Sequence, residues 1–166
     1  MLVPQGLKGS DNQTGWRNCR RDDTNNPRTD DVAFISAVVR KLVAIAAASG
    51  TIAAQSDCAR ATHPLSVLII HGTDDPLAPY QGGTVGKRNT DRGSVLSVQA
   101  TRAIRETWGD DAGPQVVVLT IRNGGHVEPS LRFHYGLFYS RIVGVQNRDL
   151  ESVEEAWSFF RNKTSR

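Results

Sequence analysis

The sequence predicts an α/β fold in which a parallel sheet is flanked by helices. Leu65–Ile70 is a near-continuous aliphatic run bounded by Pro64 and His71-Gly72, which is typical of a strand buried on both faces. Gln115–Ile121 is a second run of this kind, rich in valine, and apolar residues at helical spacing lie between the two. Because strand, helix and strand in this order form a βαβ unit over 65–126, we expect the two strands to be parallel neighbours or near neighbours.

The N-terminal third contains two further predicted segments. Residues 8–29 are polar and show no period, so they are expected to form a surface loop. Thr29 or Asp30 can cap a helix near 30–43, because a short side-chain oxygen accepts a free backbone N–H there. The apolar stretch Ala44–Thr51 fits either a continuation of this helix or a fully buried strand, and periodicity alone does not decide between them.

Two helices are predicted downstream. Ser94 is expected to cap the helix of the βαβ unit, which ends at Gly109 and Gly113-Pro114. A final helix spans about Ser152–Arg161. Its expected inner face consists of four apolar residues, namely Val153, Ala156, Trp157 and Phe160.

Composition indicates an ordinary protein of one domain, spanning 1–166. The chain has 166 residues, and its 20 Lys and Arg are scattered among 17 Asp and Glu, so we expect no nucleic-acid partner. The longest apolar run, Leu42–Ala48, is far shorter than the ~20 residues of a membrane span, and no membrane partner is expected. Met1–Gly6 has no basic n-region, so no export signal is visible. Cys19 and Cys58 are not spaced like metal ligands, and a single bridge between them stays open.

Chemically useful side chains follow both predicted strands. His71-Gly72-Thr73-Asp74-Asp75-Pro76 leaves the first strand, and Arg122-Asn123-Gly124-Gly125-His126 leaves the second. Because the carboxyl ends of parallel strands meet at one edge of a sheet, a carboxylate and a histidine should emerge side by side. An aspartate there can accept the Nδ1–H of the imidazole and hold it as a general base.

These segments resemble a known family. The stretch Pro64–Gly83, with H-G-T-D-D-P-L-A-P-Y-Q-G-G, together with N-G-G-H at 123–126 and E-A-W-S-F-F at 155–160, resembles the polyhydroxybutyrate depolymerase and feruloyl esterase branch of the α/β-hydrolases. Val3-Pro4-Gln5-Gly6, Gly15-Trp16, Cys19-Arg20 and Thr29–Val32 extend this resemblance over nearly the whole chain. It implies a serine hydrolase of polymeric or small esters, often extracellular or periplasmic, with a Ser-Asp-His triad. In that triad Asp75 is the acid, since the family's carboxylate directly precedes the proline, and His126 is the base.

The chain departs from the family at the nucleophile. An α/β-hydrolase carries its serine on a strained strand-to-helix elbow, G-x-S-x-G, and no serine here has glycine at both i−2 and i+2. In the family, a strand, the elbow and a helix separate the helix expected at 30–43 from the segment that Ala44–Ser49 resembles. Here the two abut at Val43-Ala44. The sequence therefore predicts an incomplete α/β-hydrolase-like sheet. Val127 and Glu128 also stand where the family commonly has a tryptophan.

Two functions from different classes remain. The first is a serine-type carboxylic-ester hydrolase in which Asp75 orients His126 and a segment outside this sequence supplies the serine. The second is a non-catalytic remnant that at most binds esters. Ser49, which precedes Gly50, is a weak candidate for a substitute nucleophile, and His71 is expected to be structural. We expect no cofactor and no metal, because His71, Asp74, Asp75 and His126 lack a ligand spacing such as H-x-x-x-H.

Overall fold

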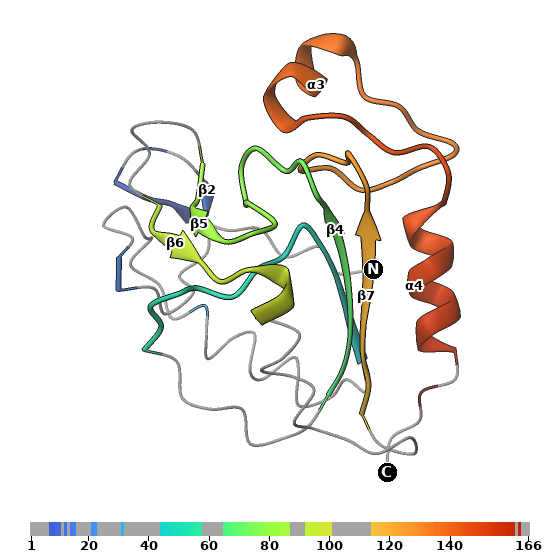
Figure 1. The fold of residues 1–166 in the computed structure, drawn as a ribbon, viewed down its shortest axis with the longest axis horizontal. Helices are drawn as coiled ribbons and strands as arrows, with labels where there is room; N and C mark the ends of the chain where they lie inside the picture. Colours follow the sequence, from blue (N-terminus) through green and yellow to red (C-terminus); the bar gives the residue numbers. More distant parts are fainter. Residues whose placement is uncertain are drawn as a thin grey trace.

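A three-stranded parallel sheet forms the centre of the molecule. The computed structural model describes residues 7–10, 12, 14–15, 21–22, 31, 44–57, 65–86, 92–100, 114–161 and 163. The strands are β3 (Ala44–Ala48), β4 (Ser66–Gly72) and β7 (Val116–Ile121), in the order β3-β4-β7, and all run the same way (Figure 1). The parallel pairing of β4 with β7 agrees with the βαβ prediction. A sheet of this kind with flanking helices is compatible with an incomplete α/β fold.

The middle strand is the most buried element. Every residue of β4 is buried, β3 and β7 pair with its two edges, and the helix Ser152–Phe160 packs against it. This is why its sequence is continuously aliphatic rather than alternating. The segment Ala44–Ala48, for which the sequence leaves helix and strand open, is a strand that pairs with β4 in register, with Ala48 opposite Ile70.

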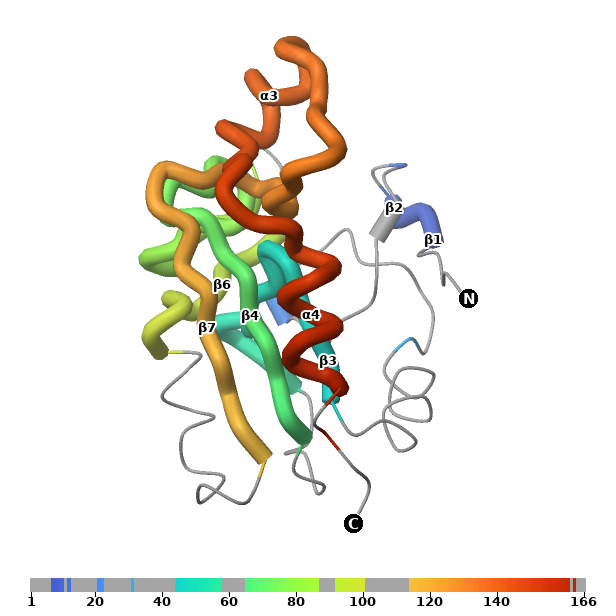
Figure 2. The backbone as a smooth tube through the Cα atoms, turned by 90° about the vertical axis from the view of Figure 1, so that its right-hand side faces the viewer, coloured from blue at the N-terminus to red at the C-terminus, as the bar shows by residue number. Residues whose placement is uncertain are grey.

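Helix α4 (Ser152–Phe160) covers one face of the sheet, where it packs across β3 and β4 (Figure 2). Its Ala156 and Phe159 pack against a core of Leu68, Ile70 and Ile121. The predicted inner face is wrong in part, since Val153 and Trp157 are 72% and 66% exposed.

An anchor at the first residue of α4 explains this difference. The N–H of Ser152 donates to the carbonyl of Pro129 at 3.2 Å, and Ser152 is buried. With Ser152 turned inward, positions 156 and 159 follow on the same side of the helix. Lys163 continues this face, and its Nζ donates to Gln115 Oε1 at 2.8 Å.

The predicted cap of the βαβ helix is also corrected. Ser94–Val95 form strand β6, which pairs antiparallel with β5 (Gly83–Thr84). Both the N–H and the hydroxyl of Ser94 donate to Asp22 Oδ2, at 2.7 and 2.8 Å. This serine therefore binds Asp22 and does not cap a helix. Ser97 caps instead: its Oγ accepts the N–H of Ala100 at 3.0 Å, and residues 98–100 are helical.

Other predictions fall mostly on parts of the chain that are not described. The rest of the βαβ helix, Cys19, Cys58 and the helix near 30–43 except Asp31 lie outside the described residues. Within the predicted polar loop, β1 (Leu7–Lys8) and β2 (Thr14–Gly15) form a short antiparallel pair.

An arm that the sequence analysis does not predict projects beyond the carboxyl edge of the sheet. It comprises residues 130–147 and contains helix α3 (Leu137–Val143), which stands above the ends of β4 and β7 (Figure 1). Its base is closed by two hydrogen bonds, from Ser130 N to Asn147 O at 3.1 Å and from Gly125 N to Val145 O at 2.8 Å. The arm therefore leaves the sheet and returns to it at the same edge. In the part of the chain that the structure describes, no helix has the length and apolar character needed to cross a bilayer.

Candidate active site

The acidic residue of the site sits in a tight turn directly after β4. Asp75 Oδ1 accepts the backbone N–H groups of Leu77 at 2.8 Å and of Ala78 at 2.7 Å. An aspartate that bonds the backbone two and three residues ahead stabilises such a turn, and Pro76 favours it by fixing φ. The turn buries the carboxylate completely and leaves Oδ2 free to face the neighbouring loop.

The histidine sits in the loop after β7, and three hydrogen bonds tie this loop to the acid loop. Thr73 N donates to Ile121 O at 2.9 Å, Asp74 N donates to Gly124 O at 3.0 Å, and Asn123 N donates to Thr73 Oγ1 at 2.8 Å. The backbones approach so closely that a Cβ on Gly72 would lie 2.1 Å from Gly124 O. Only glycine fits at position 72 without moving the chain.

The two predicted residues meet across these loops. His126 Nδ1 lies 2.8 Å from Asp75 Oδ2, although the residues are 51 positions apart in sequence. The Asp75 side chain has no exposed surface, whereas the His126 side chain is 35% exposed. Because Nδ1 is held by the carboxylate, Nε2 is the ring nitrogen left to exchange protons with a ligand.

The same carboxylate has a second histidine partner that the sequence analysis treats only as structural. His71 is fully buried, and its Nε2 lies 2.9 Å from the carbonyl of Ala78 and 3.3 Å from Asp75 Oδ2. Since a carbonyl only accepts, Nε2 must carry a proton. The i, i+4 spacing of His71 and Asp75 around a strand end is the signal that could have indicated this contact.

Tyr80 supports the buried histidine from the side and is also absent from the predicted site. Its ring packs edge-on against His71 with a centroid distance of 5.9 Å, and its hydroxyl lies 2.9 Å from Thr120 Oγ1. This tyrosine therefore ties the acid turn to β7.

These contacts set the charge state of the site. Burial opposes ionisation of Asp75, but hydrogen bonds from His126, from His71 and from the backbone of Ala78 and Leu77 outweigh it and hold the pKa of Asp75 well below its usual range. Burial likewise disfavours a charged His71. Its hydrogen bonds to Asp75 and to the Ala78 carbonyl, with the charge of Asp75, nevertheless raise the pKa of His71. At neutral pH the acid is therefore a carboxylate.

The remaining candidates lie apart from this pair. Asp74 is exposed and accepts the hydroxyl of Thr73 at 2.9 Å. Ser49 follows β3 with a positive φ of 53° and donates its N–H to Ile70 O, but among the described residues it has no hydrogen bond to His126. Among the described residues, no group of three or more His, Cys, Asp and Glu lies so that it could hold a metal ion.

A buried aspartate that holds a partly exposed histidine can act in general acid–base chemistry. A comparison with curated proteins finds one relative over part of the chain. A protein named "Putative esterase NocK", from Nocardia uniformis subsp. tsuyamanensis, is 25% identical over 149 residues, which cover 69% of this chain and 42% of that protein. The chain is similar to an esterase. This chain spans less than half the length of the relative. The similarity does not assign the chain to a particular branch of esterases. No protein-family model and no solved structure matches the chain significantly.

Proposed function

We propose that this chain carries the acid–base half of a serine-type carboxylic-ester hydrolase. The observation that carries the proposal is the 2.8 Å contact between His126 Nδ1 and the buried carboxylate of Asp75. In this role His126 Nε2 takes the proton of a serine hydroxyl as it attacks the ester carbonyl, and then returns the proton to the leaving alkoxide. Asp75 orients the ring and stabilises the imidazolium. The substrates are polyhydroxyalkanoate, feruloyl or short-chain esters.

The serine belongs to a segment that this sequence does not contain. No G-x-S-x-G is present in this sequence, which supports the absence of the segment that would carry the elbow. Loss of oxyanion donors alone raises the barrier by about 3 kcal/mol, so strong esterase activity is not expected from this chain alone.

The test uses an activated ester that needs no serine. The imidazole Nε2 of His126 is expected to attack p-nitrophenyl acetate, so that p-nitrophenolate leaves and water then hydrolyses the acetylimidazole. His126→Ala should remove most of this rate. His134→Ala is the matched control, because His134 is an exposed histidine with no carboxylate partner among the described residues. Equal rates for wild type and His126→Ala would overturn the proposal.

The missing elbow favours a second candidate, a non-catalytic remnant that binds esters. Intact-mass analysis after exposure to a fluorophosphonate separates the two, because this probe traps only an activated serine. Stoichiometric labelling that is lost in His126→Ala would reveal an unrecognised nucleophile, and Ser49→Ala would test the first candidate for it. A folded chain that takes no label and shows no His126-dependent ester cleavage would be the remnant.

A further inference from the structure

One oxygen of the buried carboxylate lies against two histidines. Asp75 Oδ2 is 2.8 Å from His126 Nδ1 and 3.3 Å from His71 Nε2. The side chains of Asp75 and His71 have no exposed surface, whereas the side chain of His126 is 35% exposed. The proposed reaction uses the contact with His126 and leaves the buried histidine without a role.

His71 also acts on the other oxygen of this carboxylate, through Ala78. Its Nε2 donates to the carbonyl of Ala78 at 2.9 Å, and the N–H of Ala78 donates to Asp75 Oδ1 at 2.7 Å. The one proton on Nε2 is therefore shared between Ala78 O and Asp75 Oδ2. Because His71 belongs to β4, these contacts hold the acid turn against the strand from which it leaves.

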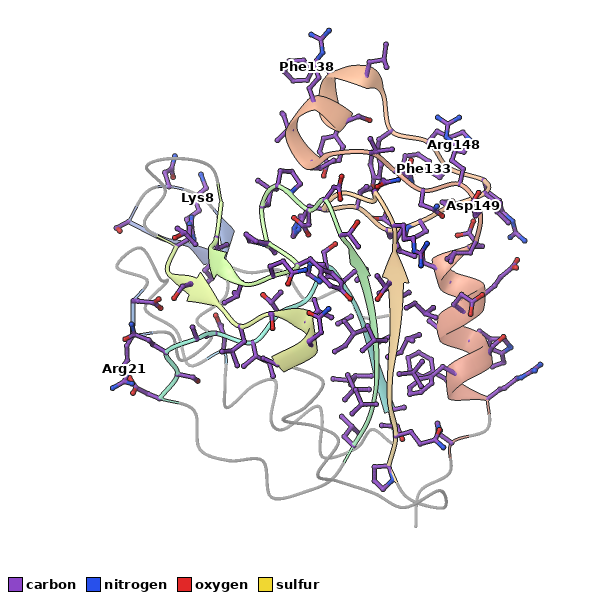
Figure 3. All side chains as sticks on the ribbon, viewed as in Figure 1. Lys8, Arg21, Phe133, Phe138, Arg148 and Asp149 are labelled. Carbon is purple, nitrogen blue, oxygen red and sulfur yellow. The ribbon has the colours of Figure 1, made fainter. Side chains whose placement is uncertain are left out.

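Asp75 is the charged group with which the ring of His71 interacts. In the part of the chain that the structure describes, the other partners of this ring are uncharged, namely the carbonyl of Ala78, the backbone of Gly50 and the edge of the Tyr80 ring. Figure 3 shows Phe138 and Arg148 pointing outward from the molecule, so these side chains take no part in the contact. Among the described charged groups, the donor on Nε2 therefore acts on Asp75 alone.

We propose that His71 is a positioning residue of the hydrolase: its Nε2–H holds Asp75 Oδ2 where this oxygen orients the ring of His126. The inference rests on the proposed function, in which His126 is the base. The two backbone N–H groups on Oδ1 restrain only one oxygen, so without His71 the carboxylate can pivot about Oδ1 and carry Oδ2 away from Nδ1. The ring of His126 then loses its fixed orientation, on which proton transfer at Nε2 depends.

Two substitutions that differ only in the length of the new side chain test this role. His71→Gln places an amide NH₂ near the position of Nε2, whereas His71→Asn is one methylene shorter and reaches only to the position of Nδ1. The first is therefore expected to keep the donor to Oδ2, and the second to lose it. Both remove the imidazole, so a difference between the two variants reports this donor and not the ring or its charge.

Two measurements follow the orientation of His126. The Nδ1–H of this residue gives a proton NMR resonance that is identified by its absence in His126→Ala, and it is protected from exchange with water while it is bonded to Asp75. The resonance is expected to persist in His71→Gln and to broaden beyond detection in His71→Asn. His126-dependent cleavage of p-nitrophenyl acetate should fall at least ~10-fold in His71→Asn, the factor that one hydrogen bond to a charged group supplies. In His71→Gln it should fall less than ~3-fold.

Ser66→Ala is the matched control for a general loss of stability. Ser66 is a buried polar residue at the other end of β4, and its Oγ accepts the N–H of Gln115 at 3.2 Å. Its substitution removes a hydrogen bond of the same strand and should change neither the resonance nor the rate. His71→Leu, which fills the space of the ring without a donor, should behave as His71→Asn does and replaces it if circular dichroism shows that His71→Asn does not fold.

The outcomes separate this inference from the proposed function. A resonance that persists in His71→Asn, equal losses in His71→Asn and His71→Gln, or the same losses in Ser66→Ala would each overturn the positioning role. A wild-type chain that shows the resonance but no His126-dependent cleavage would overturn the hydrolase function, and the resonance in the two amide variants would still decide whether His71 orients the ring. Absence of the resonance from the folded wild type would overturn both.

Discussion

Asp75→Asn is the substitution that most directly tests the charge network of the site. The carboxylate accepts two backbone N–H groups on Oδ1 and lies against His126 Nδ1 and His71 Nε2 on Oδ2. The side-chain amide of asparagine has only one acceptor atom, its oxygen. In either orientation its NH₂ group therefore faces N–H donors, which are either the two backbone N–H groups or the two histidine rings. Hydrogen bonds to a charged group contribute ~1.5–3 kcal/mol each, and two of them are lost. We therefore expect the free energy of unfolding to fall by about 3–5 kcal/mol, as when one partner of a buried ion pair is removed.

Urea unfolding at matched pH measures this change, and Asp74→Asn is the control. Asp74 is the adjacent aspartate, but it is exposed and accepts only the hydroxyl of Thr73 among the described side chains. Its substitution should cost no more than about 0.5 kcal/mol. With a urea m-value near ~2 kcal/mol/M, Asp75→Asn should lower the unfolding midpoint by about 2 M.

The pH dependence follows from the signs of the two pKa shifts. The pKa of Asp75 is lowered, so its contribution to stability is present above its unfolded pKa of about 3.9 and is lost as pH falls below that value. The pKa of His71 is raised, so its contribution is complete below about 6.5 and is lost as pH rises through the folded value. The difference between wild type and Asp75→Asn should therefore be largest between about pH 4 and 6.5.

Two results would refute this reasoning. One is equal destabilisation by Asp75→Asn and Asp74→Asn within that window. The other is a wild-type advantage over Asp75→Asn that stays constant as the pH falls well below the unfolded pKa of an aspartate. In either case Asp75 would not be the charged centre of the network.

Two further predictions concern the loop contact and the arm. Gly72→Ala would place a Cβ 2.1 Å from Gly124 O, so it is expected to lower the free energy of unfolding by ~1–3 kcal/mol and to slow His126-dependent cleavage of p-nitrophenyl acetate. Gly136→Ala, whose Cβ would meet nothing within 4 Å, should change neither, and similar losses in the two variants would contradict the contact. The hydrogen bond to Glu128 raises the pKa of Tyr135 to about 12. Glu128→Gln should return it toward about 10 in an ultraviolet titration of the phenolate, and an unchanged titration would exclude that bond. Because the pKa is raised, the bond stabilises the arm fully below pH ~10 and is lost as the pH rises toward 12.

The central strand could be predicted from sequence because a strand that is buried on both faces consists almost entirely of aliphatic residues. Val67–Ile70 are all aliphatic since nothing polar can be solvated there. For β7 the predicted burial on both faces is wrong, because this strand lies at the edge of the described sheet and only Ile121 is buried. The inner face of α4 could not be predicted, because the helix carries two apolar stripes. Periodicity favours the stripe with Val153 and Trp157, and only the anchor of Ser152 on Pro129 turns the other one inward.

In the site, too, some contacts could be predicted from sequence and others could not. Topology predicts that a carboxylate and His126 share one edge, because the ends of parallel strands meet there. The choice of Asp75 rather than Asp74 comes from the family resemblance and not from topology. The contact of His71 with Asp75 could not be predicted, since it depends on how the turn after β4 folds back onto its own strand. The cap predicted at Ser94 is wrong, because its hydroxyl has a partner 72 residues away in sequence, at Asp22.

The acid–base pair is assembled locally, which explains how it forms in a chain without a nucleophile elbow. The turn that holds Asp75 is closed by its own next residues, Leu77 and Ala78. His126 is held by Val143 of the arm, and the two loops are joined by Thr73 and Asn123. Among the described residues, none of these contacts involves β3, which lies on the far side of β4 from β7. Loss of an elbow would thus remove the attacking atom and leave the base aligned. The geometry of the pair is therefore evidence for the chemistry it can support and not for the presence of its nucleophile.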